Sequence, residues 1–207
     1  MPAINIQLLK AAAIVSGKEE TRYYLKGVCV EVIPRSFRVT DICYTATDGH
    51  RIAAFCEPTD FDAEEASPFS IIIPSDIIAD IKLFKPTTHG ALTKTEGGKY
   101  LLQYCGRDYL FAPLDATFPD WRRVIPDAAN GKTAQFNPQY LAGFGKVAKA
   151  LGGTSGAVFV HHNGDSPAPV SFPGVEGVSY ACAIMPFRGD LPAYERPAWA
   201  KCWEKQP

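Results

Sequence analysis

Residues 69–81 read FSIIIPSDIIADI, and the spacing of their apolar residues changes at Pro74. Before Pro74 the apolar run is short and nearly unbroken, which is typical of a strand. Pro74 and Ser75 suit the start of a helix, where the first backbone N–H groups have no partners. Apolar residues then follow at the spacing of one helix face: Ile77, Ile78, Ile81 and Phe84. The stretch predicts a strand that leads directly into a helix, which Pro86 stops.

The same order of elements, a strand, a helix and three further strands, is indicated three times along the chain. The copies begin near Ile4, Phe69 and Thr133, so they repeat about every 65 residues. We call each copy a module. The predicted helices are residues 7–16, the segment from Ser75 to Phe84, and a third that Asn137 caps, Pro138 begins and Gly152 ends. The predicted strands after each helix are 22–32, 37–45 and 51–56; 91–95, 100–104 and 109–113; and 157–161, 168–172 and 179–185.

Helices that recur between antiparallel hairpins favour an α+β fold, with helices on one side of antiparallel sheets. Two modules make one unit, residues 1–126, and the third module makes a smaller unit, residues 133–188. Residues 126–132 are a short polar connector between them. The remaining residues, 189–207, form a tail that contains Trp199 and Trp203 and is expected to be partly helical at 198–205.

The charge of the chain is close to neutral. Its 207 residues carry a formal charge of −1, and 46% of them are hydrophobic, as in a soluble globular protein. A protein that coats nucleic acid with its whole surface needs a strong basic excess, so that mode is excluded, whereas a confined basic lining is allowed. The sequence also lacks a run of about 20 apolar residues and a secretory signal pattern, so we expect a cytoplasmic protein that does not enter a membrane.

The six cysteines contain no C-x-x-C pair and most lie in apolar, strand-like surroundings. We expect them to be reduced packing residues rather than metal ligands or disulfides. Two sites for other chemistry can be imagined, at Asp48 with His50 and at His161 with His162. Adjacent residues of a strand point to opposite faces, however, and the sequence has none of the established hydrolase, metalloprotease or nucleotide-binding motifs. It predicts no enzyme, no catalytic residue, no metal and no cofactor.

Three stretches carry a resemblance to a known family. They are RYYLKG at 22–27 with TDGHRIA at 47–53, FPDWRRVIP at 118–126, and AIMPFR at 183–188. Together they resemble the bacterial DNA sliding clamp, the β subunit of DNA polymerase III. The resemblance implies a clamp fold, in which modules form a ring with helices lining the hole and sheets outside. Residues 1–126 resemble the middle domain of the clamp, and 133–188 resemble only the second half of its last domain.

The resemblance also implies a pocket that binds short peptides of polymerases and repair proteins. Apolar residues such as Leu25, Ile52 and Val124 would form its floor, and arginines at its rim would hold peptide carbonyls or carboxylates. Phe187 stands where a methionine is expected, which favours a stiffer pocket. The residues matched to the pocket are Arg22, Leu25, Thr47, Gly49, His50, Arg51, Ile52, Pro119, Arg123, Val124, Ile184, Met185, Pro186, Phe187 and Arg188.

In such a ring the helices would face double-stranded DNA. Lysines on or next to the three helices could contact phosphates without reading bases. These lysines are Lys10, Lys18, Lys82, Lys85, Lys146 and Lys149. The alternative interpretation of the same lysines is an ordinary solvated helix face.

Three modules per chain would need four chains to reproduce the twelve modules of the family's ring. The resemblance therefore favours a homotetramer, with a dimer, an open arc or pairing with a full-length clamp as alternatives. It implies a processivity factor of DNA replication that tethers DNA polymerase. The alternative function is an interaction module or decoy, which binds clamp-directed peptides without enclosing DNA.

Overall fold

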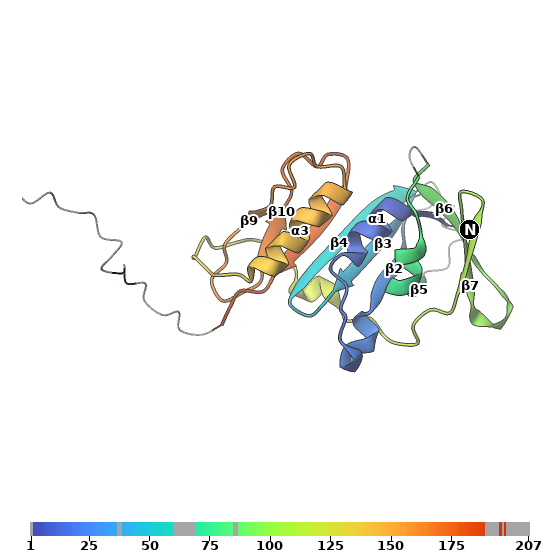
Figure 1. Ribbon diagram of the computed structural model, residues 1–207, viewed down its shortest axis with the longest axis horizontal. Coiled ribbons are helices and arrows are strands. Elements are labelled where there is room, and N and C mark those ends of the chain that lie inside the picture. The colour runs from blue at the N-terminus through green and yellow to red at the C-terminus, as the bar shows by residue number, and fades with distance from the viewer. Residues whose placement is uncertain are drawn as a thin grey trace, which may run out of the picture.

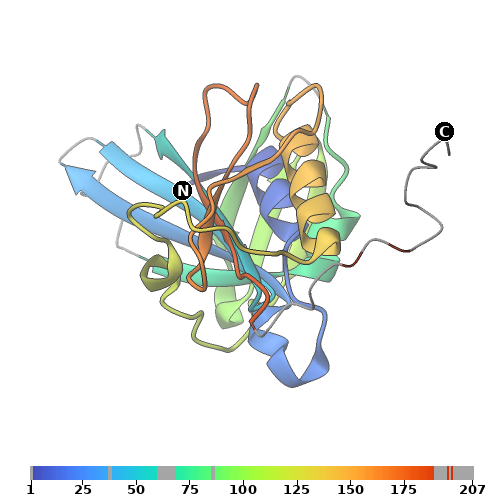
Figure 2. The ribbon, with the colours of Figure 1, turned by 90° about the vertical axis from the view of Figure 1, so that its left-hand side faces the viewer.

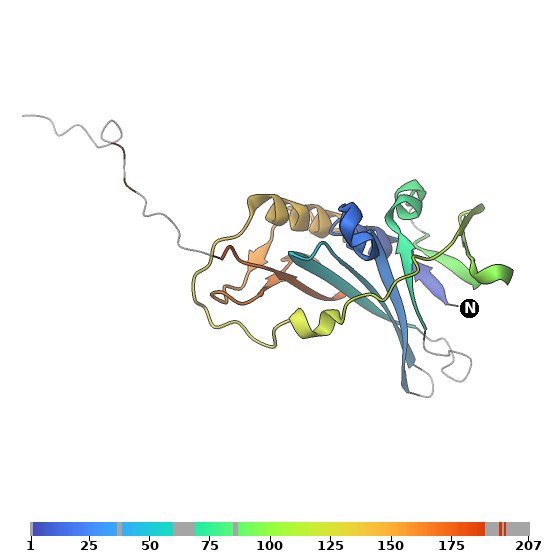
Figure 3. The same cartoon turned by 90° about the horizontal axis from the view of Figure 1, so that it is seen from below.

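The computed structural model describes residues 2–36, 39–59, 69–84 and 87–188, together with Glu195 and Pro197. It has two antiparallel sheets with a row of helices on one side (Figure 1). Viewed from below, the α-helices lie along one side and the strands of the sheets along the other (Figure 3). The α+β fold predicted from the sequence is confirmed. Within these residues, no helix is long and apolar enough to cross a membrane.

The larger sheet has seven strands and runs through both predicted units. Its order is β5 (Phe69–Pro74), β2 (Gly27–Ser36), β3 (Val39–Thr47), β4 (Arg51–Thr59), β11 (Ser179–Ile184), β10 (Ala168–Ser171) and β9 (Phe159–Val160). The units join where β4 pairs with β11, in a register that runs from Arg51 opposite Ile184 to Cys56 opposite Ser179. The backbone hydrogen bonds of this sheet therefore hold the two units together.

The smaller sheet has four strands, in the order β1 (Ala3–Asn5), β6 (His89–Lys94), β7 (Tyr100–Tyr104) and β8 (Arg107–Phe111). The first two modules exchange their leading strands. β1 of the first module pairs with β6 of the second, and β5 of the second module pairs with β2 of the first. Because neither module keeps its own first strand, the two modules form one interlocked unit.

The helical layer consists of α1 (Ile6–Ala13), α2 (Ser75–Asp80) and α3 (Pro138–Ala150). α1 is the central helix and contacts both others, and Figure 2 shows α1 and α3 side by side. Asn5 and Asn137 cap their helices, since their side-chain oxygens accept hydrogen bonds from the backbone N–H groups of Gln7 (3.0 Å) and Gln139 (2.9 Å). The amide of Gln7 also donates to the carbonyl of Ala150 (2.8 Å), which ties α1 to the end of α3.

The core lies between the helical layer and the sheets. Each large side chain that is fully buried there contributes about 1.5–3 kcal/mol. Members of this core come from both units, which again makes the units mutually dependent. The largest of its fully buried side chains are Tyr44, Phe55, Phe144, Ile4, Ile6, Leu9, Ile42, Ile73, Ile78, Ile81, Leu102 and Ile184.

Several predicted elements differ from the structure. Residues 22–25, predicted as part of a strand, belong to the 3-10 helix η1 (Glu20–Leu25), which turns Leu25 into the interior. The second helix ends at Asp80 rather than at Phe84, because Ile81 is extended and buried. Among the described residues of the third module, 133–136 form no leading strand. The two other 3-10 helices are η2 (Glu96–Gly98) and η3 (Trp121–Val124).

The expectation for the cysteines is wrong in two respects. Cys43 and Cys56 lie directly opposite each other on β3 and β4, with their Cα atoms 4.3 Å apart, and form a disulfide. Cys105 is exposed in the turn after β7. Cys29 and Cys182 are free and buried as expected, and burial raises their pKa to about 11 and about 12, respectively. Cys202 and the predicted tail helix lie outside the described residues.

Candidate functional site

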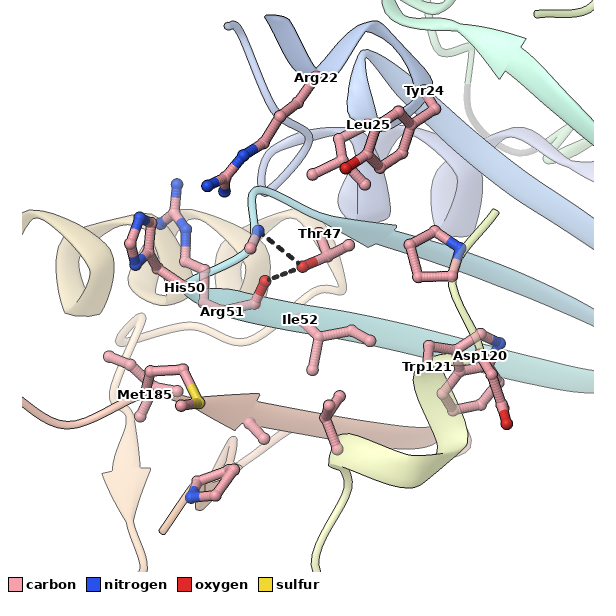
Figure 4. Close-up of a pocket in the computed structure, with 16 residues that line it drawn as sticks. Arg22, Tyr24, Leu25, Thr47, His50, Arg51, Ile52, Asp120, Trp121 and Met185 are labelled. Atoms are coloured by element: carbon pink, nitrogen blue, oxygen red, sulfur yellow. Dashed lines mark hydrogen bonds between the residues drawn. The ribbon is translucent and has the colours of Figure 1, made fainter. Parts of the chain in front are cut away.

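A cavity of about 230 Å³ lies where the β4–β11 junction meets η1 and η3. Figure 4 shows side chains from separate parts of the chain pointing into it. Leu25 comes from η1, Ile52 from β4 and Val124 from η3, while Met185 follows β11. Eleven of the residues predicted for the pocket line this one cavity: Arg22, Leu25, Thr47, Gly49, His50, Arg51, Ile52, Pro119, Val124, Ile184 and Met185.

The floor of the cavity is apolar. Leu25, Ile52 and Ile184 are at most 3% exposed, so the space above them can accept an apolar side chain without unfavourable burial of polar groups. Val124 is 44% exposed and Met185 is half-buried, so both remain accessible to a ligand. This composition favours burial of an aliphatic or aromatic anchor.

The turn between β3 and β4 presents His50 to the cavity, close to Ile52 of β4. The hydroxyl of Thr47 donates to the carbonyl of Arg51 (2.7 Å) and accepts from the N–H of Gly49 (3.0 Å). Asp48 Oδ1 accepts from the N–H groups of His50 and Arg51, both at 3.0 Å. Gly49 has φ of 87°, a conformation that residues with a Cβ rarely adopt. The turn is therefore held by its own side chains.

One wall of the cavity is η3, which is attached to the outer side of the large sheet through Glu31 of β2. Trp121 Nε1 donates to Glu31 Oε2 (2.9 Å), and both terminal nitrogens of Arg122 donate to the same carboxylate (3.3 and 3.2 Å). The Arg122 guanidinium also lies 4.3 Å from the centre of the Trp121 ring. We call these three residues the Glu31 anchor.

A second depression of about 190 Å³ adjoins the cavity. His50 and Met185 line both, so the two form a groove with two lobes. The predicted residues Pro186, Phe187 and Arg188 line the second lobe, and Phe187 is 55% exposed. The N–H of Phe187 donates to the carbonyl of Gln135 (2.8 Å), and the N–H of Met185 donates to the carbonyl of His50 (2.8 Å). These bonds hold the strand that follows β11 beside the β3–β4 turn.

Several residues of the groove are absent from the sequence prediction. Tyr140 of α3 stacks on His50 with the ring centres 5.4 Å apart, and Asn137 lies next to it in the second lobe. Asn137 caps α3 and Tyr140 lies in its first turn, and no sequence pattern there indicates that these residues line a groove. The first cavity also includes Tyr24, Asp120, Trp121, Pro167 and Ala183. Arg123, which was predicted, is exposed and lines neither lobe.

The two arginines of the first cavity differ. Arg22 is 45% exposed and lies 3.7 Å from the carboxylate of Glu19, so its guanidinium can still reach a ligand. Arg51 is only 12% exposed, and its Nε and Nη1 groups donate to Asp48 Oδ2 (2.9 Å) and to the carbonyl of Tyr140 (3.0 Å). The general expectation that arginines sit at the rim of the groove therefore fits Arg22 but not Arg51.

The lysines of the helical layer also differ. Lys18, Lys82, Lys146 and Lys149 are exposed on or next to the helices, whereas Lys85 lies outside the described residues. The ammonium of Lys10 instead donates to the carbonyls of Ile78 (3.0 Å) and Ile81 (2.5 Å) at the end of α2. Burial lowers the Lys10 pKa, and the nearby Asp80 carboxylate partly offsets this shift. Lys10 is thus half-buried and joins α1 to the end of α2.

The two candidate sites for other chemistry are occupied by structural hydrogen bonds. His161 Nε2 lies 2.8 Å from Ser171 Oγ, while His162 Nδ1 accepts from the N–H of Ala134 (3.0 Å), so the rings have different partners. Asp48 holds the β3–β4 turn and Arg51. In the part of the chain that the structure describes, no group of three His, Cys, Asp or Glu side chains is arranged to hold a metal ion.

Comparison with known proteins identifies relatives of this chain. Residues 4–120 match the family described as DNA polymerase III beta subunit, central domain. The beta sliding clamps of Escherichia coli K12 and Proteus mirabilis are 27% and 29% identical over 122 and 124 residues; each match covers 58% of this chain and 31% of the relative. The chain thus spans about a third of the length of these relatives.

Solved structures show the same fold. The sliding clamp of Bacillus subtilis superposes with a TM-score of 0.69 at 18% identity, covering 91% of this chain and 65% of that one. The sliding clamp of Bartonella birtlesii, bound to griselimycin, gives a TM-score of 0.68 at 18% identity and covers 91% and 66%. Both of these solved structures are sliding clamps. Because the match of residues 4–120 covers more than half of the 207 residues, the chain belongs to the DNA polymerase III beta subunit family.

Proposed function

We propose that the protein is a shortened sliding clamp, which encloses double-stranded DNA and tethers polymerases and other proteins by binding a short peptide in the two-lobed groove. The observation that carries this proposal is the convergence of η1, β4, η3 and the segment after β11 on one apolar cavity. Such a cavity matches an extended peptide with apolar anchors.

The groove suits reversible binding. An apolar anchor buried in each lobe contributes about 1.5–3 kcal/mol, and main-chain hydrogen bonds add to it. After the ordering cost of a flexible peptide, we expect a free energy of binding of about −8 kcal/mol, which corresponds to micromolar affinity. A tether of this strength can exchange partners.

A direct test uses a fluorescein-labelled short peptide with one leucine and one phenylalanine anchor, and measures its fluorescence anisotropy with the purified protein. Replacement Met185→Asp should weaken binding at least tenfold, because Met185 lines both lobes and a carboxylate there opposes the burial of an apolar anchor. Ala91→Asp, which introduces the same carboxylate at an exposed site on β6, should have little effect. No binding by the unmodified protein would contradict the proposal.

For DNA, we propose that the exposed lysines of the helical layer line the hole. Lys146 and Lys149 are three residues apart on α3, so they share a side of the helix. Their charges would contact phosphates in a salt-sensitive manner that permits sliding. Exchange of both for glutamate should reduce retention on nicked circular DNA and leave peptide binding unchanged. Peptide binding without retention by the unmodified protein would favour the decoy instead.

We further propose that the ring is a homotetramer, in which the unit 1–126 of one chain meets the unit 133–188 of the next. Strand β9 lies at one end of the elongated molecule, and β7 with its neighbour β8 lies at the other (Figure 1). Both outer strands carry an exposed apolar residue, Phe159 at 59% and Leu110 at 57%. Contact between unlike ends closes a ring when the rotation fits. Light scattering after size-exclusion chromatography should give four times the chain mass; a monomer would exclude it.

A further inference from the structure

The side chain of Arg51 lies between the two units, and only 12% of it is exposed. Its guanidinium donates to the Asp48 carboxylate and to the Tyr140 carbonyl, and it lies 5.1 Å from the centre of the Tyr140 ring. Asp48 is 17% exposed, so both partners of the ion pair are shielded from water. β4 and the β3–β4 turn belong to the first unit and α3 to the second. Arg51 therefore connects the units directly beside the groove.

Gly143 makes room for this guanidinium. A Cβ atom at position 143 would lie 1.7 Å from Arg51 Nη1 and 2.9 Å from Cζ, so even alanine would displace the arginine. Gly143 lies in the middle of α3, where glycine is less favourable than alanine. Because Gly143 does not have a positive φ, its backbone conformation does not require glycine. Close packing against Arg51 is the physical reason for glycine at this position.

The connection aligns the two lobes. Arg51 lies between His50 and Ile52 in the sequence, and both of these residues line the first cavity. Tyr140, which holds the guanidinium through its carbonyl and its ring, stacks on His50 and lines the second lobe. Displacement of Arg51 would thus shift Tyr140 relative to His50, and with it one lobe relative to the other.

We infer that Arg51 is a positioning residue, which with Asp48, Tyr140 and Gly143 sets the spacing between the two anchor sites of the groove. We call these four residues the Arg51 clasp. This inference rests on the proposed function, because it concerns how that groove recognises a two-anchor peptide. It assigns Arg51 a role different from direct contact with the peptide, since its Nε and Nη1 groups are already used within the protein.

The first experiment compares Gly143→Ala with Gly145→Ala, a matched change two residues along the same helix. At position 145 the new Cβ would meet only the carbonyl of Gly156 at 3.2 Å. Binding is measured for the two-anchor peptide and for two shorter peptides with the leucine or the phenylalanine alone. We expect Gly143→Ala to lower the affinity for the two-anchor peptide at least tenfold and the affinity for each single-anchor peptide less than threefold. Gly145→Ala should change each affinity less than twofold.

A general loss of stability would lower the affinity for all three peptides equally. Comparison of the two-anchor peptide with the single-anchor peptides therefore distinguishes positioning from a merely structural role. The inference is overturned if Gly143→Ala binds the two-anchor peptide as tightly as the unmodified protein does. Absence of peptide binding by the unmodified protein would instead contradict the proposed function. The two failures are therefore distinguishable.

A double-mutant cycle tests whether the effect of Gly143→Ala passes through Arg51. In an Arg51→Ala background the space around position 143 is free, so Gly143→Ala should have no further effect on two-anchor binding. If the losses of binding free energy from Arg51→Ala and Gly143→Ala simply add in the double variant, Gly143→Ala does not act through Arg51. If Gly143→Ala does not fold, as judged by circular dichroism, Asp48→Asn replaces it, because the amide keeps the turn acceptor but removes the charge that holds Arg51. The same selective loss of two-anchor binding is expected, and unchanged binding would overturn the inference.

Discussion

The groove has two walls, η3 and the start of α3. Each is joined to the large sheet through contacts that include an arginine and a carboxylate. In the Arg51 clasp the side chains of Arg51 and Asp48 are 12% and 17% exposed, whereas in the Glu31 anchor those of Arg122 and Glu31 are 47% and 21% exposed. Removing one partner of a buried pair leaves an uncompensated charge away from water, while an exposed pair is screened. The comparison indicates that similar chemistry gives a rigid wall on one side and a more adaptable wall on the other.

The largest effect is expected for Asp48→Ala. This change leaves the Arg51 guanidinium without its anion and removes the acceptor that holds the β3–β4 turn. We expect a loss of about 3 kcal/mol in the free energy of unfolding. Urea denaturation followed by circular dichroism should show a lower midpoint with an unchanged slope. If Asp48→Ala lowers the free energy of unfolding no more than Glu31→Ala does, the two walls do not differ in the way proposed.

A smaller effect is expected for Glu31→Ala, which releases Trp121 and Arg122 together. The half-buried indole N–H loses its acceptor, so we expect a loss of about 1.5 kcal/mol in the free energy of unfolding. The matched variant Glu31→Gln keeps an acceptor for the indole and should lose less than half as much. Equal losses for both variants would show that the charge, rather than the hydrogen bond of Trp121, holds this wall.

The smallest effect is expected for Arg122→Ala. Its guanidinium is half exposed, so the ion pair with Glu31 should contribute about 0.5 kcal/mol and weaken further at high salt. The free energy of unfolding, measured for both proteins in low and in high sodium chloride, gives the size of this contribution and its dependence on salt. A loss above about 2 kcal/mol would place the Glu31 anchor in the same class as the Arg51 clasp.

Local sequence patterns predicted much of the fold. The third helix begins at Pro138 after the Asn137 cap, as expected, and β7 has the predicted bounds of residues 100–104. The second helix was predicted too long because the buried, extended Ile81 depends on tertiary packing. The Cys43–Cys56 disulfide depends on the register of β3 against β4, which no local pattern specifies.

The motifs that carried the family resemblance also located most of the groove. They could not reveal Tyr140 or Gly143, because these residues acquire their roles only when α3 packs against the β3–β4 turn. For the same reason, the bonds from Lys10 to the end of α2 and the shielding of Arg51 could not be predicted. In both cases one partner of the cation is a backbone carbonyl distant in the sequence.

The central claim is that one peptide occupies a groove that both units build. Hydrogen–deuterium exchange with and without the two-anchor peptide tests it most directly, since amide protection reports both sides of the groove in one measurement. We predict added protection of residues 47–52 in the first unit together with residues 137–140 and 184–187 in the second. Protection confined to one unit, or to neither, would contradict the claim.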